Sequence, residues 1–530
     1  MRWREKTSRA AGRARLSGLT AALAGAAAIS VLVAPSAVPA TAPPGPRAVP
    51  PPTIEGVPPL PGPITAPGKP GSNGLLLLKS TPDTGNVGTK FTLSGGGLPE
   101  NKSVDIVWGT SRGAFMLDVQ PVNVAYEGRK FEPISVVLGR AKTDASGGLS
   151  VDLTAPEDYG ETHDLYLVSN GVQLAKGGFR ITRNFSVTPS EGVLGSPITI
   201  KVTGLGAHPF LSTVAIIYDN KYSGFISATT TRGTAVAQVR AAGPVGVHTI
   251  EVAPASAAVP YLDIEQSAIA FVGKHRTTFR VTKDVGPPRN SVEFPANPTP
   301  TVDSRVTLTV GTSAGVTARL APQSGPILSN VKLSASGLAP SAPAELQWLT
   351  TQGSRVNGLG WSLDQWPLGR AATAADGSLS ASIKVPEDLG GWHTVRIVQA
   401  GQVKAEVPYY LSQRLAGVTA VKVKAGEEFT VHLKGIGWTE LDNALAVTYD
   451  NAYIGYACGF YSQGDIKMNL VASGGPGTHL VDLYPMVYKS GAMNDVWLRS
   501  TPMLSFKQDA PGLALGYRIP AYHLAIQVVK

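Results

Sequence analysis

Cysteine and charge are both scarce in this sequence. Cys458 is the single cysteine among 530 residues, and Asp, Glu, Lys and Arg together make up 16% of the chain. One cysteine excludes an intramolecular disulfide framework and any metal site built from several cysteines. Stability must therefore come from burial of apolar side chains, which suits domains of roughly 100 residues.

The excess of positive charge is too small to indicate a nucleic-acid partner. The formal net charge is +9, but residues 1–40 contain six of the 46 basic residues and one of the 37 acidic ones. The rest of the chain carries only +4, without the basic run that phosphate binding uses. We expect no nucleic acid among the partners, and we expect no cofactor.

Long apolar runs are missing except near the N-terminus. Basic residues precede an apolar stretch of 18 residues, Leu16–Val33, and Val38-Pro39-Ala40 follows. That order is typical of a secretory signal peptide cleaved after residue 40, although the stretch is also long enough for an uncleaved membrane anchor. No cysteine lies near the cleavage site, so we expect no lipid anchor. The sequence predicts a secreted or cell-surface protein, in contact with a membrane only through an uncleaved signal.

A proline-rich linker follows the leader. Twelve of the 30 residues from 41 to 70 are proline, a composition that favours extended polyproline II and a semi-rigid spacer. The whole chain is rich in Gly (59) and Pro (42), which favours turn-rich β structure over helix.

The remaining sequence contains an internal duplication. Pro82-x-x-Gly85 and Trp108 recur at a shift of 240, as Pro322-x-x-Gly325 and Trp348. Gly139-Arg140-Ala141 recurs at a shift of 230, as Gly369-Arg370-Ala371, and Tyr218-Asp219-Asn220 recurs at a shift of 231, as Tyr449-Asp450-Asn451. Landmarks in this order predict two copies of a pair of units, A–B–A′–B′. The first copy has about ten extra residues between Trp108 and Gly139.

Each unit is expected to be a β-sandwich. Apolar residues alternate with others in short runs such as Ile198-x-Ile200-x-Val202, as they do in strands that bury one face. About seven short strands in roughly 100 residues are typical of the immunoglobulin-like sandwich. We predict an all-β chain with a signal peptide (1–40), a Pro-rich linker (41–72), and four immunoglobulin-like modules arranged as a duplicated pair: A (73–183), B (184–283), a linker (284–304), A′ (305–414) and B′ (415–530).

The openings and closings of the units follow recurring patterns. An opening P-x-x-G … h-x-h-x-G-x-G spans Pro189 to Gly206, and a closing D-x-x-G-x-h-x-h … P-x-x-x-G-x-x-H-x-h-x-h spans Asp144 to Leu167. These patterns resemble tandem bacterial immunoglobulin-like modules of the IPT/TIG type, which occur in secreted or surface proteins. The resemblance covers residues 75–530. It implies the fold but no single function, because such modules serve as adhesins, stalks and enzyme appendages alike.

Residues that recur in every unit are candidates for structural roles. The third strand of each unit ends in an aromatic residue that we expect in the core: Trp108, Tyr218, Trp348 and Tyr449. A histidine follows a glycine turn in each unit: His163, His248, His393 and His479. We expect these imidazoles to tie a corner by hydrogen bonds, as a tyrosine does in immunoglobulin domains. One histidine per module lacks the clustered ligands of a metal site.

A pattern of the nucleophile-elbow type occurs in a context that does not suit catalysis. Gly311-Thr-Ser313-Ala-Gly315 matches G-x-S-x-G, but a nucleophile elbow must lead into a helix. Strands dominate the surroundings, and Pro322 follows closely. A linker turn is expected here, and no catalytic residue is assigned.

Two carboxylate pairs and the cysteine also have ordinary interpretations. Neighbouring side chains of an extended chain point to opposite sides, so Glu157/Asp158 and Glu387/Asp388 are expected to be solvated loop residues, with calcium binding as the alternative.

Cys458 stands where module B has Ser227. A reactive thiol needs a base nearby, so Cys458 is expected to be a buried small residue, with pairing between chains as the alternative.

Module B′ is more aromatic than module B, and its surplus rings could form an exposed platform for a sugar or a protein. The candidate contact residues are Trp438, Tyr453, Tyr456 and Tyr461.

The sequence favours a non-enzymatic exported binding or structural protein, adhesin- or scaffold-like, of the cell surface or extracellular space. Its partner would be an unknown protein or a cell-envelope polysaccharide. The alternative is a secreted polysaccharide-acting enzyme or its accessory carbohydrate-binding protein.

The joints between units lead to a prediction about geometry. Few residues separate Phe179–Arg183, which closes module A, from Phe185-x-Val187, which opens module B. We expect A and B to form one rigid unit, and A′ and B′ another. Five prolines in residues 284–304 predict a flexible spacer between the pairs, followed by a strand at Val306-x-Leu308-x-Val310.

Overall fold

The computed structural model describes residues 60–64, 74–255, 258–263, 275–295, 304–309, 311–354, 360–459, 463–488 and 500–530. All of these belong to one of the two units into which the chain divides, Pro43–Lys530. Strands make up 60% of the structure and helix 1%, and the strands form sandwich-like sheets, so the predicted all-β class is confirmed. The predicted signal peptide and most of the linker 41–72 lie outside the described residues. Within those residues, no helix is long and apolar enough to cross a bilayer.

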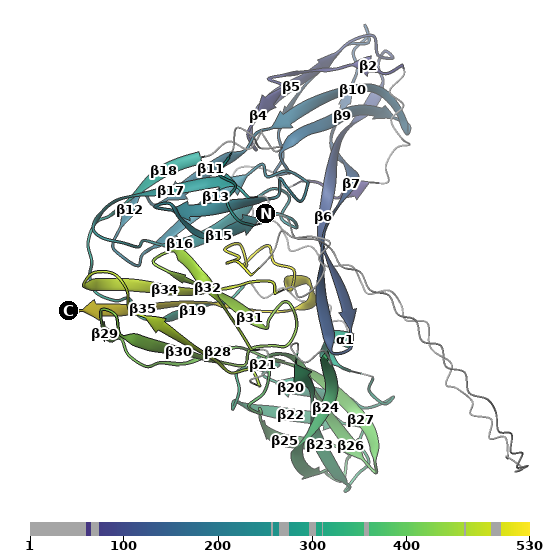
Figure 1. The fold of residues 1–530 in the computed structure, drawn as a ribbon. Helices are drawn as coiled ribbons and strands as arrows, with labels where there is room; N and C mark the ends of the chain where they lie inside the picture. Colours follow the sequence, from purple (N-terminus) through teal and green to yellow (C-terminus); the bar gives the residue numbers. More distant parts are fainter. Residues whose placement is uncertain are drawn as a thin grey trace, which may run out of the picture. The chain divides into compact units, whose positions relative to one another are not determined.

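The strands of module A form two sheets (Figure 1). The smaller sheet contains β3 (Lys79–Thr81), β5 (Lys90–Gly95) and β8 (Leu149–Thr154). The larger sheet has the order β1-β7-β6-β9-β10-β2, and β4 also pairs with β10. Its strands are β1 (Pro63–Ile64), β2 (Leu76–Leu77), β4 (Thr84–Gly85), β6 (Ser103–Gln120), β7 (Asn123–Lys142), β9 (Glu161–Ser169) and β10 (Val172–Ile181). The extra residues of the first copy lengthen the β6–β7 hairpin.

Module B repeats this plan with a sheet of three strands and a sheet of five. The smaller sheet, in the order β11-β13-β16, contains β11 (Asn184–Thr188), β13 (Pro197–Thr203) and β16 (Ala235–Arg240). The larger has the order β12-β18-β17-β14-β15 and contains β12 (Glu191–Gly192), β14 (Thr213–Tyr218), β15 (Lys221–Ser227), β17 (Gly246–Pro254) and β18 (His275–Val281).

Module A′ also has sheets of three and five strands. The smaller sheet, β20-β22-β25, contains β20 (Thr317–Ala321), β22 (Asn330–Ser336) and β25 (Leu379–Lys384). The larger, β21-β27-β26-β23-β24, contains β21 (Ser324–Gly325), β23 (Pro343–Ser354), β24 (Gly360–Ala372), β26 (Gly391–Gln399) and β27 (Gln402–Leu411).

Module B′ differs because β19, a strand from the linker 284–304 between modules B and A′, joins its larger sheet. The smaller sheet, β28-β30-β33, contains β28 (Arg414–Val418), β30 (Glu428–Lys434) and β33 (Ile466–Val471). The larger has the order β19-β35-β34-β31-β32, and β29 pairs with β35. It contains β19 (Ser291–Glu293), β29 (Lys422–Lys424), β31 (Ala444–Tyr449), β32 (Ala452–Cys458), β34 (Gly477–Pro485) and β35 (Ala521–Val529). A 3-10 turn, η2 (Leu513–Leu515), precedes β35.

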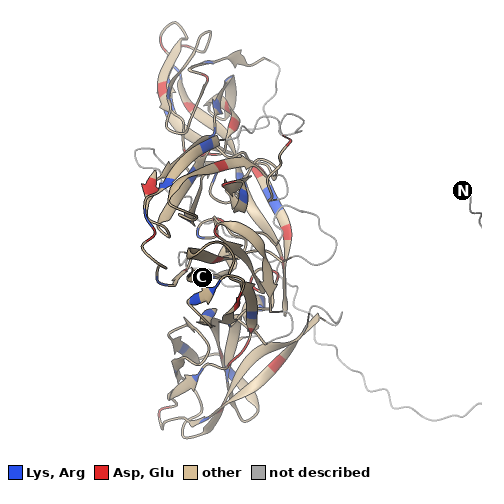
Figure 2. Cartoon of the chain, turned by 60° about the vertical axis from the view of Figure 1, so that its left-hand side comes forward, with Lys and Arg blue, Asp and Glu red and all other residues tan. Residues whose placement is uncertain are grey.

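Alternating side chains build the cores as the pattern predicts. In β13, the side chains of Ile198, Ile200 and Val202 are fully buried, and Lys201 between them is only half-buried. Modules A and A′ each have a separate core. Modules B and B′ share one continuous core, to which the β6–β7 hairpin adds Phe115. In the view of Figure 2, basic and acidic residues are interspersed along the strands, in keeping with the small net charge.

The linker 284–304 is not a free spacer over its first part. Strand β19 pairs antiparallel with β35, and Asp284 accepts hydrogen bonds from Thr478 N–H (3.1 Å) and from the Thr478 hydroxyl (2.9 Å). The expected flexibility is therefore wrong for residues 284–295, because Asp284 is bonded to Thr478 and residues 291–293 pair with the edge of β35. Residues 296–303 lie outside the described residues. A short helix, α1 (Ser304–Thr307), stands where a strand was expected.

Modules B and B′ are joined by direct hydrogen bonds, so the two pairs are not separate rigid bodies. Leu504 N–H donates to Phe225 O at 2.8 Å, and Phe225 N–H donates to Pro502 O at 2.9 Å. Asp509 of B′ is buried and accepts from the Ser227 hydroxyl at 2.6 Å. The expectation of a flexible joint failed because residues 502–509, between β34 and β35, run along module B.

The β6–β7 hairpin of module A also takes part in these joints. Tyr126 N–H donates to Glu440 Oε2 at 2.8 Å, and Glu440 N–H donates to Val124 O at 3.2 Å. Arg129 donates to the Thr213 hydroxyl of module B at 2.6 Å. The insertion therefore connects module A to both B and B′.

Candidate functional site

Module A buries a cluster of tryptophan, aspartate and histidine. Trp108 Nε1–H donates to Asp158 Oδ2 at 2.7 Å, and the His163 ring stacks on the indole with centroids 4.4 Å apart. Both His163 nitrogens face carbonyl oxygens, Nδ1 to Gly109 O at 2.8 Å and Nε2 to Tyr159 O at 2.7 Å. The imidazole therefore lies between two backbone segments, one in β6 and one in the turn before β9. Asp158 Oδ2 lies 3.7 Å from Nδ1, and burial raises the pKa of this carboxyl.

Module A′ repeats the cluster with nearly the same distances. Trp348 Nε1–H donates to Asp388 Oδ2 at 2.8 Å, and the His393 ring stacks on the indole at 4.5 Å. The Asp158 and Asp388 side chains are 0% and 1% exposed. The expectation of solvated loop carboxylates is therefore wrong for both aspartates and for the buried Glu157; only Glu387 is exposed, where it pairs with Lys434 at 3.3 Å. The loops are buried because each aspartate meets an indole from a distant strand.

The histidines of modules B and B′ bind an aspartate directly. His248 Nδ1 lies 2.5 Å from Asp219 Oδ2, and His479 Nδ1 lies 2.6 Å from Asp450 Oδ2. The hydrogen bond to Asp450 raises the pKa of His479. In all four modules Nε2 contacts the carbonyl oxygen four residues earlier. Each imidazole thus links a turn to a strand, which is the geometry of a folding element.

The aromatic residues of the third strands lie at equivalent places. Trp108, Tyr218 and Trp348 are buried, whereas Tyr449 is half-buried. The hydroxyls of Tyr218 and Tyr449 donate to equivalent carbonyls, Ala242 O at 2.9 Å and Ser473 O at 2.7 Å.

The aromatic side chains proposed as a platform do not gather on one surface. Trp438 is only 3% exposed, so its ring does not reach a ligand, and its inclusion was wrong. The Tyr453 hydroxyl donates to Ser500 O, and its ring meets the Tyr222 ring edge-on at 6.2 Å. Tyr456 is 47% exposed, and Tyr461 lies outside the described residues. Tyr456 alone among the described candidates has the exposure that ligand contact needs.

Ser313 and Cys458 have ordinary surroundings. Ser313 N–H donates to Lys404 O at 3.0 Å, and its hydroxyl lies 3.3 Å from Val403 O. The hydroxyl is therefore directed at the backbone of β27 instead of at a base. Cys458 is half-buried beside Met486, and is less buried than its counterpart Ser227.

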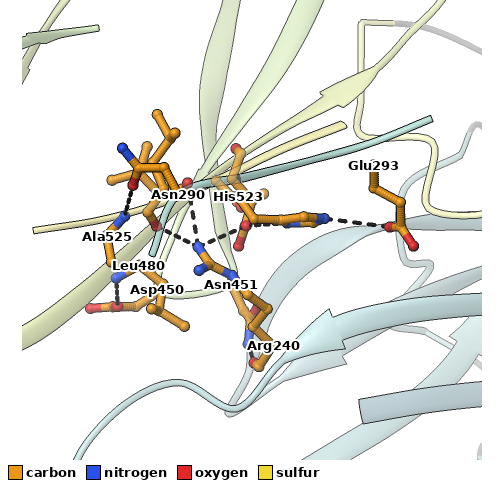
Figure 3. Close-up of polar contacts among 12 residues, drawn as sticks. Arg240, Asn290, Glu293, Asp450, Asn451, Leu480, His523 and Ala525 are labelled. Carbon is orange, nitrogen blue, oxygen red and sulfur yellow. Dashed lines mark hydrogen bonds and ion pairs between the residues drawn. The ribbon is translucent and has the colours of Figure 1, made fainter. Parts of the chain in front are cut away.

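The strongest concentration of buried charge lies where module B meets module B′ (Figure 3), and sequence reasoning missed it. Arg240, at the end of β16, lies 2.8 Å from Asp482 Oδ1 on β34. Asp482 Oδ1 is also 2.6 Å from His523 Nδ1 on β35. His523 Nε2 lies 3.4 Å from Glu293 Oε2 on β19, and Glu293 pairs with Lys507 at 2.5 Å. We call these five side chains the junction cluster.

Backbone groups complete the junction cluster. Arg240 donates to Leu524 O at 2.5 Å, and the Asn451 side chain donates to Arg240 O at 2.7 Å. Asp482 is completely buried and the Arg240 side chain is 9% exposed. A charge withdrawn from water this far is tolerated only with an opposite charge and hydrogen bonds beside it. The contacts therefore hold B against B′ in one arrangement.

The charges of the junction cluster shift one another's protonation. Burial by itself lowers the pKa of His523, but the hydrogen bonds to Asp482 and Glu293 outweigh it and raise the pKa to about 9. The hydrogen bond from His523, with help from Lys507, lowers the pKa of Glu293 to about 2. Burial alone would raise the pKa of Asp482, yet Arg240 and His523 hold it below its usual value.

The Asp482–His523 contact has the spacing of the acid–base half of a hydrolytic triad, but not its chemistry. In such a triad, histidine Nε2 faces a hydroxyl and is unprotonated when it acts as a base. Here Nε2 faces a carboxylate, and the raised pKa keeps the ring protonated at neutral pH. A cavity of about 250 Å³ adjoins the cluster. Among the described residues, no three acidic, histidine or cysteine side chains are grouped to hold a metal.

One sequence signal could have located the junction cluster. The residue three positions after the repeated histidine faces a residue on the next strand, and in three modules the two side chains are oppositely charged. The pairs are Glu251–Arg276 in B, Arg396–Glu406 in A′ and Asp482–His523 in B′, whereas module A has Tyr166–Lys176. The pattern predicts a cross-strand pair in each of these modules, but it does not predict which pair is buried by contact with another module.

Comparison with known proteins identifies no family. No family model matches the chain, and no curated protein matches it. Among solved structures, a variant of Salmonella alpha-2-macroglobulin is similar over 84% of this chain and 30% of its own length, with 8% identity and a TM-score of 0.16. This chain therefore spans about a third of that protein.

Two smaller structures are similar at the same level. The ICAM-5 D1–D4 ectodomain fragment is 12% identical over 86% of this chain and 100% of its own, with a TM-score of 0.16. A protein described as membrane-anchored from Corynebacterium diphtheriae is 11% identical over 63% of this chain and 89% of its own, with a TM-score of 0.17. At these TM-scores the likenesses carry no argument about module arrangement or function.

Proposed function

We propose that this chain is a non-enzymatic, exported binding or structural protein built from four immunoglobulin-like modules of the IPT/TIG type, in the order A–B–A′–B′. It acts at the cell surface or in the extracellular space, and its partner is a protein or a cell-envelope polysaccharide. The observation that carries the proposal is that the buried charged side chains form contacts between strands and modules. The junction cluster and the four histidine clusters hold strands and modules together through ion pairs and hydrogen bonds within the chain.

The arrangement supports a scaffold better than an enzyme. A general base must be unprotonated and within reach of a substrate proton, whereas His523 is held protonated between two carboxylates. The nucleophile pattern at Ser313 faces backbone. Joined modules B and B′ with a connecting hairpin give a rigid body that presents surfaces, which suits adhesion or assembly. The N-terminal leader and proline-rich linker support export.

Localisation and binding can be tested together in the source cells. We would express the full chain with a C-terminal tag, treat intact cells with a protease, and identify proteins and polysaccharide captured from the solubilised envelope. Surface cleavage and retention of an envelope component are expected. A chain that is protected from the protease and stays in the cytosolic fraction would contradict the proposal. Hydrolysis of cell-wall glycan by the purified chain would favour the secreted polysaccharide-acting enzyme instead.

A further inference from the structure

In module A, a piece of the proline-rich linker covers the edge of the larger sheet. Strand β1 pairs antiparallel with β7, with Pro63 opposite Val136 and Ile64 opposite Ser135. Leu60, just before β1, is 7% exposed and belongs to the core of module A. The linker therefore adds an outer strand to β7 and inserts one side chain into the core.

Strand β24 of module A′ is the counterpart of β7. Gly139-Arg140-Ala141 and Gly369-Arg370-Ala371 align the two strands at a shift of 230. Each hairpin has an irregularity at the same place, between Ile106 and Val107 in A and between Leu346 and Gln347 in A′. Val136 and Ser135 thus correspond to Trp366 and Gln365.

The two strands differ in what covers them. Within the described residues, β24 is the last strand of its sheet, and no strand pairs with its outer edge. Val136 is completely buried, whereas Trp366 is half-buried, and Gln365 is exposed where Ser135 is half-buried. Leu363, two residues before Gln365, is 53% exposed. An edge of 13 residues with apolar side chains and unpaired backbone is a template for another strand.

A hollow lies at the same point. A cavity of about 350 Å³ is lined by Gln365, Trp366 and Pro367 of β24 and by Leu346 of β23, with Glu345 and Arg370 at its side. Trp366 Nε1–H donates to Asp364 Oδ2 at 3.0 Å, which holds the indole in place. Pro367 lacks an N–H, but its counterpart Val137 makes no pair with β1. A strand in the register of β1 would pair only with Gln365 and Trp366, so the missing N–H of Pro367 would not prevent docking.

We propose that the outer edge of β24 binds an extended, proline-containing segment of a partner protein by strand addition, in the register that β1 adopts on β7. The segment is like Leu60–Ile64: a proline pairs with Trp366 and the apolar residue after it pairs with Gln365, as Pro63 and Ile64 do with Val136 and Ser135. An apolar side chain a few residues earlier, like that of Leu60, enters the hollow at Leu346. Backbone hydrogen bonds supply affinity in this mode, and pockets for alternate side chains supply selectivity. The inference names a partner class for the binding function proposed above and rests on it.

The probe is a fluorescent peptide of residues 58–66, titrated against the purified full chain by anisotropy. We expect saturable binding that Trp366→Ala weakens at least tenfold. Trp361→Ala, on the same strand but outside the paired positions, is the matched control and should leave the affinity unchanged. A peptide with Ile64 replaced by Asp should bind at least tenfold more weakly. No binding at millimolar peptide, or equal loss in both tryptophan variants, would overturn the proposal.

Hydrogen exchange distinguishes the two acceptor edges. Peptide binding should slow exchange of amides in β24 and leave β7 unchanged. Protection of β7 instead would mean that the peptide displaces β1, and would overturn the assignment to β24. Self-association of the full chain that Trp366→Ala abolishes would make a second copy the occupant and would also overturn it. Failure of the peptide to bind while an envelope partner is still captured would refute this inference and leave the proposed function standing.

Discussion

Modules B and B′ place an acid–base pair at the same point, yet the two pairs lie in different surroundings. Glu251 and Arg276 face each other across β17 and β18, and Asp482 and His523 do so across β34 and β35. The Arg276 side chain is 66% exposed, whereas its counterpart His523 is 13% exposed. The difference comes from Arg240 and β19, which cover the pair in B′. The same cross-strand position therefore carries a partly exposed ion pair in B and a buried contact between two modules in B′.

Removal of the arginine at the junction should have the largest effect. Arg240→Ala leaves Asp482 buried without its guanidinium partner, a change that typically costs about 3–5 kcal/mol. Urea unfolding of the full chain should show this as a lower midpoint or as separate unfolding of B and B′. A loss no larger than that of Arg276→Ala would mean that the burial of the B′ pair has no energetic consequence.

The pH dependence of stability should come next. The pKa of His523 is raised to about 9 in the folded chain, above an unfolded value of about 6.5. The stabilisation is therefore fully present below pH 6.5 and is lost as pH rises through 9. A shift of this size corresponds to about 3 kcal/mol. Thermal unfolding of the wild type and His523→Gln from pH 6 to pH 10 should show a difference that shrinks toward high pH; a constant difference would contradict the assigned protonation.

Detachment of the linker strand should have a smaller effect. Glu293→Gln removes the ion pair with Lys507 and weakens the bond to His523, with an expected loss of about 1–2 kcal/mol. The pH dependence attributed to His523 should flatten, because the pKa of His523 loses one of its two raising contacts. Limited proteolysis should then cut residues 284–295 sooner than in the wild type. Unchanged proteolysis would show that the backbone pairing with β35 is sufficient by itself.

The pair in module B, whose arginine is mostly exposed, should give the smallest effect. Arg276→Ala removes the 2.9 Å contact to Glu251, and exposed pairs contribute about 0–1 kcal/mol. The contribution should vanish in 1 M salt, because screening acts within a few ångströms at that ionic strength. The corresponding loss for Arg240→Ala should persist in the same salt, since buried charges are screened much less. Equal salt sensitivity of both variants would remove the contrast between B and B′.

Local sequence patterns determined the strands and the repeated histidine contacts. Alternation in Ile198-x-Ile200-x-Val202 places one face inward, because successive side chains of a strand point to opposite sides. The four histidines recur with their turns, and Nε2 reaches the carbonyl four residues earlier in each module. These contacts are made within a few residues of chain, so a local pattern is sufficient to specify them.

Only the tertiary structure decided which of these elements would be covered. Asp158 and Asp388 lie in loops that local patterns describe as polar, and both are buried because an indole from a distant strand meets them. Trp438 is only 3% exposed, although its sequence context allowed a surface position. The sequence by itself determined an all-β chain with repeated turns and faces. The joining of B to B′ depends on contacts such as Arg240–Asp482, between residues more than 200 positions apart, which no periodic pattern encodes.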